Sequence, residues 1–187
     1  MEPPPCFYTS VTEPDLDIGT VRSATPNDDS WDSWTKGGKL TTAPDLGEVA
    51  YRDPFVFRDG GQWRMFVGAG LEGRTAAAVS YSSPDLSQWT LDGIAAQRSG
   101  TETDPVWTGT MWECPQLFDI GSSHVLVTSI WEDDVLHYVA YGVQGRCRRI
   151  RSVPSAGKTL CPRWDSNRVP ALRRSNGQDM PGGRVDG

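Results

Sequence analysis

The chain has 187 residues, of which 37% are apolar and 22% are charged, a balance that suits one soluble globular domain with a real core. The net charge of −6 is unevenly spread: residues 144–187 carry +7, which leaves −13 for residues 1–143. An acidic body argues against nucleic acid as a partner. No stretch reaches the ~20 apolar residues of a membrane span.

Short strands separated by turns follow one another along the chain. Turns such as Arg58-Asp59-Gly60-Gly61 interrupt the apolar runs, and no segment keeps a helical period. We therefore predict an all-β fold. In chain order, the expected strands are Cys6–Ser10, Gly19–Ala24, Phe55–Arg58, Trp63–Gly68, Ala76–Ser82, Gln116–Asp119, His124–Ile130 and Leu136–Val143.

Cysteines and histidines give no sign of a metal site. The four cysteines contain no CxxC pair and fit neither a zinc site nor a compact disulfide framework, and the two histidines are expected to be ordinary strand residues. The N-terminal Met-Glu-Pro-Pro-Pro lacks the basic start and apolar middle of a signal peptide, so a cytoplasmic location is the default expectation.

A tryptophan-containing segment occurs twice. Residues 83–90 (Ser-Pro-Asp-Leu-Ser-Gln-Trp-Thr) echo residues 25–35, and Trp34 and Trp89 lie 55 residues apart. A unit of about 50–60 residues with four short strands is typical of a β-propeller blade. We expect each segment to form the turn into the outermost strand of a blade, with its Asp and Ser bonding to nearby backbone and its Trp covering the edge.

The units are too few to close a propeller, which needs about 4–8 blades. The pattern begins inside a first blade and stops after about residue 143, so we predict a partial propeller domain over residues 1–143. Over residues 144–187 the alternation ends, and Arg, Ser, Pro and Gly dominate. Two explanations stay open: a disordered basic tail, or a shift of the reading frame near Gly145, which the abrupt change in composition favours.

Two short stretches each place a carboxylate beside a proline at the start of an apolar run. They are Arg52-Asp53-Pro54-Phe55 and Trp112-Glu113-Cys114-Pro115, whose prolines lie 61 residues apart. Acids entering equivalent strands of a repeated unit can converge on one cavity, and paired carboxylates are the minimum equipment for cleaving a glycosidic bond, at ~5–10 Å apart. The simpler alternatives are that Asp53 caps a strand and that Glu113 is an ordinary rim carboxylate.

On these two motifs and their order, the chain resembles glycoside hydrolase family 32, the β-fructofuranosidases, invertases, levanases and inulinases. The resemblance runs from about Phe7 to Val143 and rests on Arg52-Asp53-Pro54 and Glu113-Cys114. It implies a five-bladed β-propeller with a funnel-shaped site on its axis. This chain would hold only a partial set of the blades.

The resemblance also implies a role for each matching residue. Glu113 matches the general acid/base, and Asp53 matches the acid that stabilises the transition state by bonding fructosyl hydroxyls. Arg52 matches a residue that helps to hold the sugar. Cys114 matches the cysteine beside the acid/base, and Trp112 is expected to contribute to substrate binding and to flank Glu113. No metal or organic cofactor is implied, and the expected partner is a carbohydrate, such as sucrose, levan or an inulin-like fructan.

The chain departs from the family at the nucleophile. In the family this is an aspartate in an Asn-Asp-Pro-Asn-Gly-like motif near the N-terminus, and no such motif is present here. Asn27-Asp28-Asp29 is no substitute, because it belongs to the Trp34 turn and lacks the following Pro and Gly. We therefore expect the intact parent to hydrolyse terminal β-fructofuranosyl bonds by a retaining mechanism, and this chain to be inactive.

Two alternatives remain. The first is a related five-bladed glycosidase family that acts on arabinosides or xylosides. The pairing of Arg-Asp-Pro with Glu-Cys argues against this family. A non-catalytic propeller that binds carbohydrate, or a gene remnant without function, would agree with the missing nucleophile.

Overall fold

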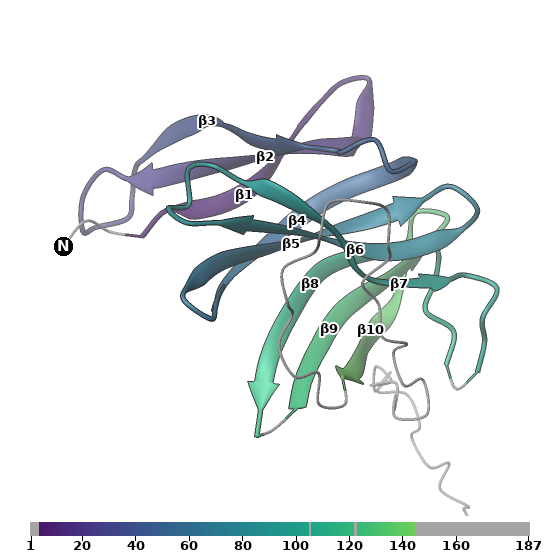
Figure 1. Ribbon diagram of the computed structural model, residues 1–187. Coiled ribbons are helices and arrows are strands. Elements are labelled where there is room, and N and C mark those ends of the chain that lie inside the picture. The colour runs from purple at the N-terminus through teal and green to yellow at the C-terminus, as the bar shows by residue number, and fades with distance from the viewer. Residues whose placement is uncertain (1–3, 105, 122, 145–187) are drawn as a thin grey trace, which may run out of the picture.

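The computed structural model describes residues 4–104, 106–121 and 123–144, and in these ranges it contains ten strands and no helix (Figure 1). Because no helix is present there, none is long and apolar enough to cross a membrane. The strands are β1 (Cys6–Thr12), β2 (Asp15–Pro26), β3 (Trp34–Thr42), β4 (Glu48–Asp59), β5 (Gln62–Leu71), β6 (Thr75–Ser83), β7 (Thr90–Ser99), β8 (Met111–Ile120), β9 (Ser123–Glu132) and β10 (Val135–Gln144).

The strands form three consecutive antiparallel units. β1, β2 and β3 are neighbours, β4 to β7 follow one another in sequence order, and β8, β9 and β10 form a separate three-stranded sheet. The first two units are joined by one parallel bridge between Ile18 of β2 and Tyr51 of β4. Figure 1 shows the β4–β7 unit as the middle layer, with β1–β3 above it and β8–β10 below it.

The middle unit is buried on both faces, which explains its composition. β5 and β6 read as nearly continuous runs of apolar and small residues, as expected for strands without a solvent face. The core toward the first unit contains Val21, Tyr51, Met65, Val67, Ala69, Leu71, Ala77, Val79 and Tyr81. The core toward the third unit contains Phe66, Ala76, Ala78, Ala96, Trp112, Leu126, Ile130 and Ala140.

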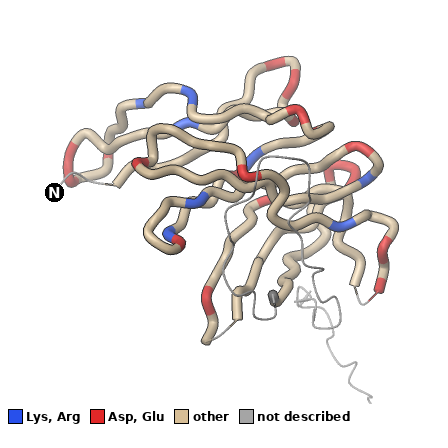
Figure 2. The backbone as a smooth tube through the Cα atoms, viewed as in Figure 1, with Lys and Arg blue, Asp and Glu red and all other residues tan. Residues whose placement is uncertain are grey.

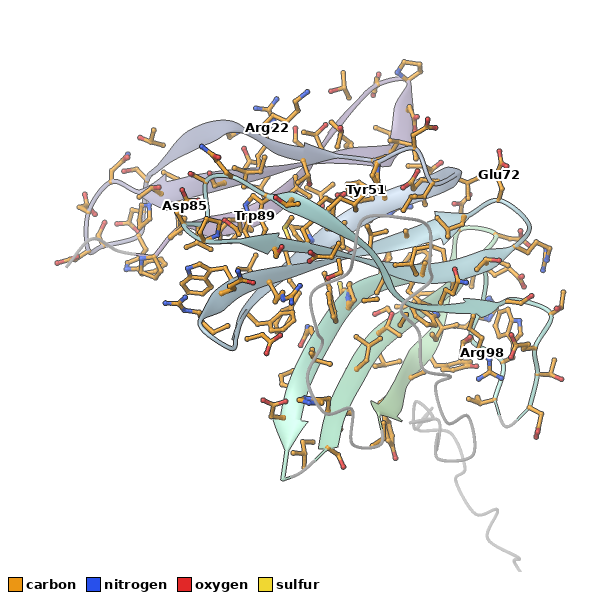
Figure 3. All side chains as sticks on the ribbon, viewed as in Figure 1. Arg22, Tyr51, Glu72, Asp85, Trp89 and Arg98 are labelled. Carbon is orange, nitrogen blue, oxygen red and sulfur yellow. The ribbon has the colours of Figure 1, made fainter. Side chains whose placement is uncertain are left out.

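The repeated tryptophan segments form the same turn. Trp34 Nε1 donates to Trp31 O at 3.0 Å, and Trp89 Nε1 donates to Leu86 O at 3.1 Å. The aspartate that opens each turn accepts the backbone N–H of the serine two residues later, at 2.9 Å in both. Each turn leads into the outer strand of its unit, β3 or β7, as the repeat predicts. Figure 3 labels Asp85 and Trp89 of the second turn. Trp89 is half-buried against the core, whereas Trp34 is 37% exposed.

The all-β prediction is confirmed for the described residues, and all eight predicted strands are present there. β3 and β7 are not among those eight ranges, although the repeat predicted an outer strand after each tryptophan turn. The predicted tail, residues 144–187, lies outside the described residues except for Gln144 at the end of β10.

Candidate active site

The two carboxylate–proline motifs lie on equivalent β-bulges. Between regular pairs of the β4–β5 ladder, Asp53 and Pro54 together oppose a single residue, and Cys114 and Pro115 do the same in the β8–β9 ladder. The first residue of each bulge has a left-handed backbone, with φ of 63° at Asp53 and 48° at Cys114. A proline suits the second position because the ladder is interrupted there and needs no N–H. A non-glycine residue at positive φ stores strain of about 1–3 kcal/mol, and such strain gathers at functional sites.

These bulges agree with the sequence repeat, in which Pro54 and Pro115 lie 61 residues apart. The structure makes Asp53 equivalent to Cys114, and it makes Arg52 equivalent to Glu113. The two carboxylates therefore occupy neighbouring positions of the repeat rather than the same one. Asp53 is the first residue of its bulge, whereas Glu113 is the residue directly before the other bulge.

Asp53 connects the two bulges directly. Its Oδ2 accepts the backbone N–H of Cys114 at 3.3 Å and lies 3.5 Å from the Cys114 thiol, which donates to it. The Asp53 N–H in turn donates to Thr9 Oγ1 of β1 at 2.7 Å. Asp53 is thus bonded to all three units of the fold: it belongs to the second and contacts the first and third.

Arg52 holds the third unit against the second by charge. Its Nε lies 3.2 Å from Glu113 Oε1, and its Nη2 lies 3.1 Å from Asp17 Oδ1 and 3.5 Å from Met111 Sδ. Within the described part of the chain, buried Arg52 Nε has no well-aligned hydrogen-bond acceptor. Arg52 and Glu113 are therefore joined by an ion pair whose geometry leaves that N–H poorly satisfied.

Glu113 is a carboxyl group that resists ionisation. Its side chain is 14% exposed. Burial raises its pKa above the usual 4.5, the nearby charge of Asp53 raises it further, and Arg52 opposes both effects. A carboxyl group that keeps its proton to higher pH is suited to general acid catalysis.

The Cys114 thiol stays protonated beside this pair. Burial and the neighbouring Asp53 carboxylate raise its pKa to about 11. It is therefore a neutral hydrogen-bond donor to Asp53 and no nucleophile at neutral pH.

An open pocket of about 390 Å³ lies against this cluster, and Arg52 and Glu113 are among the residues that line it. The turns after β5 and β9 form part of its wall, including Arg74, whose guanidinium pairs with Glu132. Glu72, labelled in Figure 3, stands at the turn after β5. The pocket is rich in charge and open to solvent.

The structure brings four of the five sequence-predicted site residues together. Arg52 and Glu113 line the pocket, and Asp53 and Cys114 bond to each other beside it. Trp112 lies apart: its indole is 5% exposed in the core and donates to Thr108 O at 2.9 Å. A contact between this ring and substrate would require it to leave that position.

Sequence reasoning missed several residues that build the site. Thr9 and Asp17 carry no motif, so no sequence signal marked them. Gly68 of β5 carried a signal, since an isolated glycine inside a strand indicates a close backbone approach. A Cβ on Gly68 would overlap the carbonyl oxygen of Trp112 and lie 3.2 Å from the Cα of Glu113. Glycine therefore lets β8 approach β5 closely enough to place Glu113.

Among the described residues, no group of three or more His, Cys, Asp or Glu is arranged to hold a metal ion. The chemistry available at the pocket is that of carboxyl groups, a guanidinium and backbone amides.

Curated relatives of this chain include a sucrose-6-phosphate hydrolase and a levanase. The chain is 33% identical over 124 residues to a sucrose-6-phosphate hydrolase of Bacillus subtilis (strain 168), covering 66% of this chain and 25% of the relative. It is 31% identical over 102 residues to a levanase of the same organism, covering 54% of this chain and 13% of the relative. The chain thus spans a quarter or less of these curated relatives.

Solved structures agree at the level of fold. The Bombyx mori GH32 beta-fructofuranosidase BmSUC1 matches with a TM-score of 0.59 at 22% identity, covering 74% of this chain and 31% of that one. The sucrose-6-phosphate hydrolase from Lactobacillus gasseri matches with a TM-score of 0.56 at 21% identity, covering 76% and 30%. Residues 4–159 match the model of the glycosyl hydrolases family 32 N-terminal domain. The chain therefore belongs to glycoside hydrolase family 32.

Proposed function

We propose that this chain is part of the catalytic domain of a β-fructofuranosidase, and that its three units are consecutive blades of a five-bladed β-propeller. Two features support the blade assignment. Each unit is an antiparallel meander, and the first two reach their outer strand through the same tryptophan turn. The intact parent would act on terminal β-D-fructofuranosyl bonds.

One observation carries the proposal: Glu113, with its raised pKa, is paired with Arg52 and lies beside Asp53, which bonds to the residue after it. In the proposed reaction, Glu113 protonates the oxygen of the leaving group and later deprotonates the attacking water. Asp53 accepts hydrogen bonds from fructosyl hydroxyls, which strengthen in the oxocarbenium-like transition state. Arg52 positions Glu113 and helps to hold the sugar, and Cys114 holds Asp53.

The retaining mechanism also needs a nucleophile to form the glycosyl-enzyme intermediate. The sequence has no Asn-Asp-Pro-type motif to supply it. We therefore propose that this chain binds fructosides without turning them over, and that activity belongs to a longer parent. Trp112, buried as it is, would act by fixing the backbone before Glu113.

The substrate class follows from the relatives. Their names include sucrose-6-phosphate hydrolase, raffinose invertase and levanase, and a fructan 1-exohydrolase from Cichorium intybus was solved in complex with 1-kestose. Sucrose and fructans of the levan or inulin type are the proposed substrates of the parent.

A second candidate, a propeller that binds carbohydrate without any catalytic parent, is favoured by the missing nucleophile motif. Under that reading, Glu113 and Asp53 would serve binding alone. Glu113→Gln would then change only the affinity for the carbohydrate, even in a longer protein that contains this chain.

Ligand binding by the purified chain tests the proposal. Saturation-transfer NMR should detect methyl β-D-fructofuranoside but not methyl α-L-arabinofuranoside. Asp53→Asn should weaken fructoside binding by about tenfold or more, because it removes a charged acceptor of hydrogen bonds. Asp45→Asn is the matched control: Asp45 is an exposed aspartate that also has a left-handed backbone, with φ of 65°. Preference for the arabinoside, or binding that Asp53→Asn leaves unchanged, would refute the fructoside site.

A further inference from the structure

We propose that the pocket selects neutral fructosides and rejects phosphorylated ones. This inference rests on the proposed function and narrows it, because the named relatives include sucrose-6-phosphate hydrolases as well as a raffinose invertase and a levanase. It concerns the wall of the pocket rather than the Asp53–Glu113 pair, and it depends on the balance of charge around the ligand.

The wall is strongly acidic. The described residues that line the pocket include six carboxylates and two guanidiniums, and they include no lysine or histidine. The carboxylates are Asp17, Glu72, Glu113, Glu132, Asp133 and Asp134. Figure 2 shows acidic segments at the turn after β5 and in the β9–β10 hairpin beside it.

Both guanidiniums are already neutralised. Arg52 is shared between Asp17 and Glu113, and Arg74 pairs with Glu132. A phosphoryl group in this pocket would have to compete with a carboxylate for either arginine. Phosphate recognition usually relies on arginine or lysine side chains that are free of other anions, and among the described lining residues both arginines already have a carboxylate partner.

Three of the carboxylates have no cationic partner among the described residues: Glu72, Asp133 and Asp134, all exposed. Asp133 and Asp134 form the two-residue turn between β9 and β10, with φ of 51° and 58°. Positive φ at both central residues is the geometry of a type I′ hairpin turn. Both aspartates therefore lie at the tip of the β9–β10 hairpin, where they line the pocket.

The size of the effect follows from Coulomb's law. A phosphate monoester carries nearly two negative charges at neutral pH. Three unpaired carboxylates at roughly 10 Å should weaken its binding by about tenfold at low salt. Screening should reduce that penalty as the Debye length falls from about 30 Å at 0.01 M salt to about 3 Å at 1 M. A neutral sugar should show neither the penalty nor the salt dependence.

The test compares sucrose with sucrose 6-phosphate, which differ by one phosphoryl group. Dissociation constants for the full chain are measured by NMR titration at about 0.01 M and about 0.5 M salt. The variant Glu72→Gln/Asp133→Asn/Asp134→Asn removes the unpaired charges, and Asn keeps the left-handed turn. The control Glu13→Gln/Asp29→Asn/Asp32→Asn removes the same charge at exposed positions that do not line the pocket.

We expect sucrose 6-phosphate to bind wild type at least about tenfold more weakly than sucrose at low salt, with a smaller gap at high salt. The rim variant should narrow the gap between the two dissociation constants by tightening the binding of sucrose 6-phosphate, and the control variant should leave the gap as it is in wild type. Equal or tighter binding of sucrose 6-phosphate by wild type, or a gap as wide in the rim variant as in wild type, overturns the inference alone. Failure of wild type to bind either sugar overturns the proposed function, and this inference with it.

Discussion

At the scale of single residues, burial and two charged neighbours, Asp53 and Arg52, have opposing effects on the pKa of Glu113. Burial and the Asp53 carboxylate favour its protonated form, and the Arg52 guanidinium favours its ionised form. Since its folded-state pKa lies above the unfolded value of about 4.5, the native state binds this proton more tightly. The stability that Glu113 contributes is therefore fully present below pH 4.5 and is lost as the pH rises through the raised pKa.

This balance predicts opposite responses to two substitutions. Asp53→Asn should lower the pKa of Glu113 toward 4.5, because it removes a like charge, and Arg52→Gln should raise that pKa further, because it removes the compensating cation. The pKa is measured by following the ¹³C shift of the Glu113 carboxyl carbon during an NMR pH titration. Asp45→Asn should leave the titration unchanged. A Glu113 that titrates at or below 4.5 in wild type would contradict this account of the site.

The sequence identified most of the residues that form the site, but it did not show how they are arranged in space. Arg52, Asp53, Glu113 and Cys114 were marked by two proline-containing motifs, and the structure brings them together. The 61-residue spacing of the two prolines gave the equivalence of Arg52 with Glu113 and of Asp53 with Cys114 correctly, whereas the bulges themselves could not be read from the sequence. The acids of the hairpin turns, such as Asp133, could not be assigned to the pocket either, because turn acids are common on any surface.

At the scale of elements, the strands most easily predicted are those with a buried face. β5 and β6 were predicted from their apolar runs, whereas β3 and β7 were expected only as an outer strand after each tryptophan turn, without residue ranges. Those two strands lie at the outer edges of their units, and they are largely polar, with exposed positions and internal glycines. Backbone pairing with β2 or β6 holds them in place, and a strand held mainly by its neighbour leaves little hydrophobic pattern in the sequence.

The approach of β5 to β8 gives a second prediction. Gly68→Ala should destabilise the protein by about 2 kcal/mol, because its Cβ would overlap backbone that cannot move aside cheaply. It should also weaken fructoside binding, since Glu113 would shift with β8. Urea unfolding and the NMR titration measure the two effects.

Gly38→Ala in β3 is the control for that substitution, because a Cβ at Gly38 meets nothing within 4 Å. Its stability should change by no more than about 0.5 kcal/mol. If Gly68→Ala were as stable and as competent in binding as Gly38→Ala, β8 would not need this close approach to place the site.

At the scale of the whole molecule, the three units stack through two apolar cores that share the β4–β7 sheet. Asp53 of the middle unit is hydrogen-bonded to Thr9 of the first unit and to Cys114 of the third, so the candidate site depends on the packing of all three units. The all-β class and the repeat were predictable from turn chemistry and strand patterns. The stacking was not, because it depends on contacts between residues far apart in the sequence.

The central claim is that this chain carries the acid/base and the stabilising acid of a fructosidase without its nucleophile. The measurement that tests it most directly is fructose release from sucrose and from levan by the purified chain, assayed beside Glu113→Gln. We predict no release above the buffer blank for either protein, because an acid/base alone cannot form the glycosyl-enzyme intermediate. Clear turnover by wild type that is lost in Glu113→Gln would contradict the claim, since it would require a nucleophile within this chain.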